Sequence, residues 1–395
     1  MTDSQCPGVS SWASDFDHGS QEWADDPYAI VESLKNSGCP IAHTQRYGGV
    51  WLPVTYDLIK EIAIDTKNFS TEGINSPKKR PYQQTASSDP PFSKIARSLL
   101  TPVFSLDASE LWQAEISSVC KSLISQIDNK TSVDIIDKYA NKIPSIIIQK
   151  MLGFSEEDVE KFDDWINFFV HRFEEPSKER LLTYLKYKKH ITNHINNCIN
   201  NPKDDVISYL LKCEISGKPL SIEHLIGIIS IIIVAGIDTV SSVIGSSLWY
   251  LATHSVDRRR LVENPDMIPA AVEEFLRAYA PATMARLVKE DMEFHGVQMK
   301  KEDWVLLPFF SANRDEQHFA NPHEVVIDRK DNRHVTFGLG IHRCVGEHLA
   351  RLEITIAIQL FLQSFKNFSL DDKNDLVWSS GQLRKLLKLS VVFED

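Results

Sequence analysis

A single cysteine among glycines places the strongest constraint on how this chain folds. Cys344 stands in the run FGLGIHRCVG, residues 337–346, between Gly340 and Gly346. Glycines let backbone amides approach a sulfur or a ligand closely, because no Cβ stands in the way. An amphipathic helix is predicted to begin at Glu347, and the positive end of its dipole favours a thiolate over a thiol. The pattern indicates a sulfur suited to binding iron. The alternative is a buried structural cysteine in a turn.

The composition is that of a globular protein from a reducing compartment. Of the 395 residues, 43% are hydrophobic and 25% are charged, which is ordinary for a chain that buries a large core. The net charge of −11 argues against nucleic acid or an anionic membrane as the main partner. The six cysteines show no C-x-x-C spacing, and the N-terminus has no secretory signal. We therefore predict a cytoplasmic protein with reduced thiols and no membrane association.

Hydrophobic periodicity predicts a mainly α-helical protein with a smaller β portion. Helical patterns dominate from about residue 92 to residue 285, and the longest apolar run covers residues 225–237. That run is too short to span a bilayer and is typical of a buried core helix. Strand patterns appear at 47–54, as a hairpin through Gly48 and Gly49, and again after Pro281.

A second chemical signal lies inside the apolar helix expected over residues 221–253. The run Ala235-Gly236-Ile237-Asp238-Thr239 places an acid beside a hydroxyl in hydrophobic surroundings. A buried acid is costly unless it is hydrogen-bonded or used in chemistry. Gly236 lacks a side chain one turn from Thr239, and we expect this to open room for a diatomic ligand. The alternative is a kinked helix with a solvated aspartate.

A third signal is the pair Glu274 and Arg277. Residues three apart lie on one helical face and can pair. An exposed pair stabilises a helix by only about 0.2–0.5 kcal/mol. Taken alone, E-x-x-R is a weak motif, and a surface ion pair is its default interpretation.

Together these motifs resemble those of the cytochrome P450 family. F-G-x-G-x-H-x-C-x-G is similar to the family's haem-ligating loop, and A-G-x-D-T resembles its oxygen-binding helix. The likeness covers nearly the whole chain, from Trp23, and is greatest to soluble bacterial members, including camphor- and cineole-hydroxylating types. It implies one haem domain over residues 1–395, with haem b between the oxygen-binding helix and the cysteine-loop helix, and with Cys344 as the iron ligand.

The resemblance also implies roles for residues around the haem. Thr239 would hydrogen-bond dioxygen, and Asp238 would help to relay protons. Glu274 and Arg277 would be a buried structural pair joined by Arg329. Propionate contacts would come from Arg97, Arg286 and His334, although Ser93 stands where many relatives carry a histidine. Further cofactor contacts would be Ala235, Gly236, Phe337, Gly338, His342 and Gly346.

The implied activity is that of a monooxygenase, which inserts one atom of dioxygen into a small organic substrate. The two electrons would come from a separate ferredoxin or flavodoxin with its reductase, docking on Lys94, Arg97, Arg343 and Arg351. Substrate contacts would come from Tyr82, Ile233, Val234, Ile237, Ala282, Thr283, Met284 and Leu383. Their mixture of apolar and polar groups favours a compact terpenoid or a methyl ether, oxidised by hydroxylation or O-dealkylation.

Two other functions fit the same cysteine loop. A peroxide-driven haem peroxygenase would not need Asp238 and Thr239, and their presence argues against it. A non-catalytic haem sensor would share the thiolate but would need no proton relay.

Overall fold

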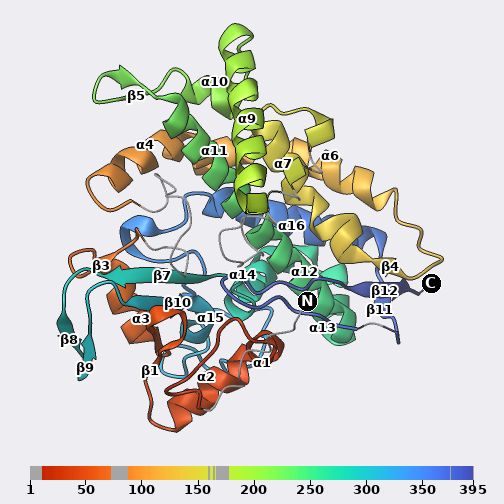
Figure 1. Ribbon diagram of the computed structural model, residues 1–395. Coiled ribbons are helices and arrows are strands. Elements are labelled where there is room, and N and C mark those ends of the chain that lie inside the picture. Colours follow the sequence, from red (N-terminus) through yellow and green to blue (C-terminus); the bar gives the residue numbers. More distant parts are fainter. Residues whose placement is uncertain are drawn as a thin grey trace.

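The computed structural model describes residues 11–72, 88–158, 161–162, 165, 178–373 and 375–394. Helices make up most of it, as the periodicity predicted (Figure 1). The helices in the N-terminal half are α1 (Gln21–Asp25), α2 (Pro27–Asn36), α3 (Tyr56–Ile64), α4 (Phe92–Phe104), α5 (Leu106–Glu110), α6 (Gln113–Ile124), α7 (Lys142–Met151) and α9 (Lys178–Asn200). Those in the C-terminal half are α10 (Val206–Leu210), α11 (Ile222–Gly236), α12 (Asp238–Thr253), α13 (Ser255–Glu263), α14 (Ile268–Ala278), α15 (Phe309–Ala312) and α16 (Glu347–Ser364).

The β portion is built mainly around one mixed sheet. Its five strands run in the order β1 (Ile41–Thr44), β2 (Val50–Pro53), β10 (Trp304–Pro308), β7 (Thr283–Val288) and β3 (Phe69–Ser70). A second sheet has the order β11 (Phe368–Leu370), β12 (Ser390–Phe393) and β4 (Val133–Asp134). Two short hairpins complete the described strands, β5 (Glu214–Ile215) with β6 (Lys218–Pro219) and β8 (Met292–Phe294) with β9 (Val297–Met299).

The five-stranded sheet buries both of its faces because its strands alternate. Leu306 in β10 packs into a cluster with Trp23 of α1 and Val31 of α2. The neighbouring Leu307 packs into another cluster with Ile59 of α3. Successive side chains of a strand point to opposite faces, so the sheet is covered by α1 and α2 on one side and by α3 on the other. The hairpin predicted around Gly48 and Gly49 is confirmed as β1 and β2, paired antiparallel.

The helical core is centred on α12, α14 and α16, which pack against one another (Figure 1). The apolar run predicted as one core helix is interrupted: α11 ends at Gly236, and α12 begins at Asp238. Together α11 and α12 are long and apolar enough to cross a membrane by length and composition, but 61% of the tested window is buried inside the protein. A core helix passes the same test, and burial of this segment among other helices matches the expected core helix.

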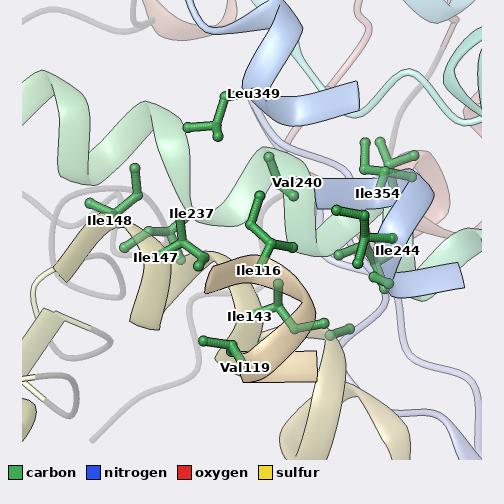
Figure 2. Close-up of a cluster of buried hydrophobic side chains, with 14 of the residues drawn as sticks. Ile116, Val119, Ile143, Ile147, Ile148, Ile237, Val240, Ile244, Leu349 and Ile354 are labelled. Carbon is green, nitrogen blue, oxygen red and sulfur yellow. The ribbon is translucent and has the colours of Figure 1, made fainter. Parts of the chain in front are cut away.

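Branched aliphatic side chains fill the space between α12, α7 and α6. Figure 2 shows Val240 and Ile244 of α12 gathered with Ile143 and Ile147 of α7 and with Ile116 of α6. These side chains expose 5% of their surface or less. This packing sets the rotation of α12 about its axis, and with it the direction in which the residues of the predicted oxygen-binding motif point.

Candidate functional site

The cysteine loop has a closed backbone geometry that only glycine permits at two positions. Gly338 and Gly340 have φ angles of 74° and 67°, in the left-handed region that residues with a Cβ avoid. The amide of Cys344 donates to the carbonyl of Phe337 over 2.7 Å, which closes the loop. Gly346 is the N-cap of α16. The sulfur therefore lies one turn before a long core helix, as the sequence predicted.

The electrostatics of Cys344 differ from the expectation. The residue keeps accessible surface, but the surrounding protein desolvates its sulfur, and this burial raises the pKa of the thiol. A hydrogen bond from the Gly346 amide and the nearby Arg97 and Arg351 lower the pKa, but these effects are smaller. The helix terminus therefore acts in the predicted direction, but in the protein alone burial outweighs it and the pKa of the thiol is raised. A bound metal cation would reverse this balance, because thiolate ligands lose their proton to the metal.

A buried arginine lies beside the loop without a counter-ion among the described residues. Arg286 of β7 is 4% exposed and donates to the carbonyl of its neighbour Ala285 over 2.8 Å. Burial lowers the pKa of Arg286 to about 10, although Asp89 acts in the opposite direction. An unpaired buried cation is costly. The side chain is therefore suited to receive an anionic group.

Two more polar atoms near Arg286 and Arg97 are buried without a protein partner in the described part of the chain. They are Nε2 of His342 and Oγ of Ser93. Burial and then the charge of Arg286 lower the pKa of His342 to about 4, so its ring is neutral. Ser93 lies one helical turn before Arg97, whose guanidinium donates to the carbonyl of Arg343. Unused donors around a buried cation fit the carboxylates of haem, whose iron would meet the sulfur of Cys344.

His334 does not join this group. Its Nδ1 accepts from the amide of Thr336 over 3.3 Å, and its Nε2 donates to Glu273 over 3.1 Å. Arg351 donates to the same carboxylate over 2.7 Å. With both ring nitrogens bonded to protein, His334 has no donor left for a propionate, so this predicted contact is wrong. His342, which is two residues before the cysteine, has the free nitrogen that His334 lacks.

Asp238 and Thr239 point in different directions from the start of α12. The Asp238 carboxylate is buried and accepts from Nζ of Lys385 over 2.6 Å. The Thr239 hydroxyl donates to the carbonyl of Ala235 over 2.8 Å, so its oxygen remains an acceptor toward other groups. The alternative of a solvated aspartate is therefore wrong. The two roles implied by the family resemblance stay predictions.

Gly236 has a different purpose from the expected one. A Cβ at this position would lie 2.8 Å from Cδ1 of Ile148 in α7. The missing side chain therefore lets α11 and α7 approach closely, and it does not make room for a diatomic ligand. Ala235, the preceding residue, is exposed although its helix is mostly buried. Ala235 lies on the face of α11 that keeps accessible surface.

The same rotation separates the predicted substrate contacts on α11. Ile237 packs beside Ile147 and Ile148 in the core, as Figure 2 shows, and it is 2% exposed. Ile233 lies one turn earlier on this face and is 1% exposed. Both predictions are therefore wrong, because the helix turns these side chains toward α7. Val234 is half-buried and stays a prediction.

The remaining predicted substrate contacts meet at the start of β7. Ala282 pairs with Leu383 in an isolated bridge, and the amide of Thr283 donates to the carbonyl of Gln382 over 2.8 Å. Strand alternation places Ala282, Met284 and Arg286 on one face. Thr283 shares the other face with Ala285, which packs against the cluster of α1 and α2. The prediction for the Thr283 side chain is therefore wrong. Tyr82 lies outside the described residues.

The E-x-x-R pair is a buried structural unit. Glu274 receives two hydrogen bonds of 2.8 Å from Arg277 and one of 2.9 Å from Arg329. Both members of the pair are 0% exposed. Burial alone would raise the pKa of Glu274, but hydrogen bonds from Arg277, the Val326 amide and Arg329 outweigh it and lower the pKa. The three predicted side chains do meet, and the surface-pair interpretation is wrong.

Three charged residues of the site were missed by the sequence reasoning. Lys385 pairs with Asp238, and Glu273 and Glu347 pair with cations around the cysteine loop. Glu347 had a local signal, since it is four residues after Arg343 and four before Arg351. Lys385 had none, because its partner is 147 residues away.

Comparison with known proteins identifies the class to which this fold and loop belong. The family model for cytochrome P450 matches residues 49–389. The polyketide biosynthesis cytochrome P450 PksS of Bacillus subtilis (strain 168) is 33% identical over 307 residues, which cover 77% of this chain and 76% of that protein. The PksS structure has a TM-score of 0.89 at 29% identity, covering 96% of this chain and 100% of that chain.

Two further solved structures are similar. Cytochrome P450 BioI has a TM-score of 0.86 at 28% identity, covering 95% of this chain and 99% of that chain. CYP109E1 of Bacillus megaterium has a TM-score of 0.87 at 25% identity, covering 95% of this chain and 100% of that chain. The chain belongs to the cytochrome P450 family. It is accordingly a haem b monooxygenase that takes a substrate, dioxygen and electrons from redox partners.

Proposed function

We propose that Cys344 binds the iron of haem b, and that the bound haem oxidises a small organic molecule in one cytoplasmic domain. The observation that carries the proposal is the arrangement of Cys344 between α16 and a set of buried, unused donors. When bound, haem supplies the activation of dioxygen, and the oxidative chemistry belongs to the cofactor. Arg286, His342, Arg97 and Ser93 would hold its propionates.

The residues of α12 would manage protons and water. The Thr239 hydroxyl, whose proton is donated to Ala235, presents its oxygen as a hydrogen-bond acceptor. The Asp238 carboxylate, next in the chain and buried, can take up a proton and release it. This pair supports a monooxygenase over a peroxide-driven peroxygenase or a haem sensor, which need no proton relay. A turnover assay with hydrogen peroxide as the only oxidant tests the choice between these functions.

The substrate class is proposed from the lining residues and the relatives. Val234, Ala282, Met284 and Leu383 supply mostly apolar contact. The relatives are named for polyketide biosynthesis, for testosterone and for a hexadecenoic acid carried on an acyl carrier protein. The steroid and the fatty acid are largely hydrocarbon. We propose an apolar substrate with few polar groups, such as a terpenoid or a methyl ether, that is hydroxylated or O-dealkylated.

The electron donor would be a ferredoxin or a flavodoxin that docks near the cysteine loop. The structure changes the expected charge of this face. Arg343 pairs with Glu347 over 2.6 Å, and Arg351 pairs with Glu273 over 2.7 Å, so two of the four proposed cations are neutralised. Lys94 is exposed and Arg97 half-buried. Because Arg97 is assigned to a propionate, we propose that Lys94 supplies most of the free positive charge for an acidic carrier.

A spectrum tests the proposed function most directly. Reduced holo-protein exposed to carbon monoxide should show the long-wavelength Soret band that thiolate ligation produces. Cys344→Ser should abolish this band, whereas Cys213→Ser, at a half-buried free thiol elsewhere in the protein, should leave it intact. Retention of the band in Cys344→Ser would refute the ligand assignment.

A further inference from the structure

A lysine from the C-terminal turn holds the acid of the predicted proton relay. Nζ of Lys385 lies 2.6 Å from Oδ1 of Asp238, and the two side chains expose 10% and 4% of their surface. Removing both charges from water is costly, so a pair this deeply buried persists only with close geometry and further hydrogen bonds. The contact therefore restrains the position of the Asp238 carboxylate strongly.

The turn that carries Lys385 is itself fixed to the body of the site. Ser242, one helical turn after Asp238, donates to the carbonyl of Arg384 over 2.7 Å. The amide of Lys385 donates to Oγ of Ser379 over 2.9 Å, and the amide of Ser379 donates back to the carbonyl of Lys385 over 2.8 Å. The lysine is thus held on its own segment as well as by the aspartate.

The same turn also carries the residue proposed to contact substrate. Leu383 forms a bridge with Ala282, and the carbonyl of Gln382 accepts from Thr283 at the start of β7. Lys385 follows Leu383 by two residues. The proposed substrate contact and the lysine that binds Asp238 are therefore held on one turn.

We propose that Lys385 is a positioning residue for the reaction: it holds the Asp238 carboxylate in place, and it links that carboxylate to the turn at the substrate contact. The inference rests on the proposed function. In the absence of the lysine, the carboxylate loses the ammonium group that lies 2.6 Å from its Oδ1, so its position is less restrained. A relay acid that is less well placed transfers its proton less efficiently, because proton transfer needs both groups within hydrogen-bond reach.

The test uses holo-protein with a reconstituted electron-transfer system. Lys385→Met should lower kcat about tenfold. KM and the spectral dissociation constant of the substrate should change less than about twofold, since only the relay is affected. The solvent deuterium isotope effect on kcat should rise, and Lys385→Arg should restore most of the rate. Lys388→Met is the matched control, because Lys388 is an exposed lysine three residues further along. It should behave as the parent protein.

The double variant separates this role from a structural one. Asp238→Asn with Lys385→Met should have the same kcat as Asp238→Asn alone, because Lys385 acts only through Asp238. It should also unfold at a higher temperature than Lys385→Met, and it remains informative if that single variant does not fold. A further tenfold loss in the double variant, or an unchanged kcat in Lys385→Met, would overturn the inference. Absence of reductant-dependent product from the parent protein would instead refute the proposed function.

Discussion

Glu274 and Arg277 face each other through two parallel hydrogen bonds of 2.8 Å, and neither side chain exposes any surface. The remaining guanidinium protons of Arg277 go to the carbonyls of Asn313, Pro322 and Glu324. The pair therefore anchors α14 to the long irregular segment that precedes the cysteine loop.

Breaking this pair should destabilise the protein strongly. Glu274→Ala leaves a buried arginine without its counter-ion, so the free energy of unfolding should fall by about 3–5 kcal/mol. Urea denaturation of the holo-protein measures this change. Lys300→Ala breaks an exposed pair with Asp291, 66% and 63% exposed, and should cost less than about 1 kcal/mol. Equal losses in the two variants would contradict the assignment of the buried pair as an anchor.

The carboxylate of Glu273 should make the stability of the protein sensitive to acid. Burial would raise its pKa, but hydrogen bonds from His334 and Arg351 outweigh this and lower the pKa to about 2. The folded protein therefore keeps this carboxylate charged where the unfolded chain protonates it. The stabilisation is present above pH 4.5 and is lost as the pH falls toward 2.

Unfolding measurements across this pH range test the effect. Glu273→Gln should reduce the slope of unfolding free energy against pH between 4.5 and 2. Glu223→Gln, at a side chain that is 66% exposed, should keep the parent slope. The same slope in all three proteins would show that Glu273 is not responsible.

Arg286 should have opposite effects on the protein with and without haem. Arg286→Met removes a buried cation that has no counter-ion among the described residues, so the haem-free protein should become more stable. The same change removes a propionate partner, so haem should be lost faster. Haem transfer to an apo-myoglobin acceptor and thermal unfolding of the haem-free protein measure the two effects. Arg259→Met, at an exposed arginine, should change neither.

Gly236 should be required for helix packing. In Gly236→Ala the new methyl group meets Cδ1 of Ile148 at 2.8 Å, and such overpacking costs about 1–3 kcal/mol. Ile148→Val removes that carbon and leaves Cγ1 at 3.1 Å, so the double variant should recover part of the stability lost in Gly236→Ala. Thermal unfolding of the four proteins makes the comparison. If Ile148→Val gave no relief, the close approach of α11 and α7 would not explain the glycine.

The amino-acid sequence by itself determined the features that depend on neighbouring residues. The glycines of the cysteine loop are needed for positive φ angles at Gly338 and Gly340, and the hairpin at Gly48 and Gly49 follows from the same property. Spacing of three residues placed Glu274 and Arg277 on one face of a helix. The helical and strand periodicities likewise predicted a mainly α-helical protein with a smaller sheet.

Only the tertiary structure decided which way each element faces and which distant groups meet. Helical periodicity does not say how α11 is rotated against α7, and packing turned Ile237 into the core and left Ala235 accessible. The sequence likewise could not show that Asp238 binds Lys385, which is 147 positions further along the chain. Nor could it show that both ring nitrogens of His334, rather than those of His342, are bonded to protein groups. These outcomes follow from how complete helices and turns pack together. A buried charge or hydrogen-bonding group pairs with whichever partner this packing brings within reach.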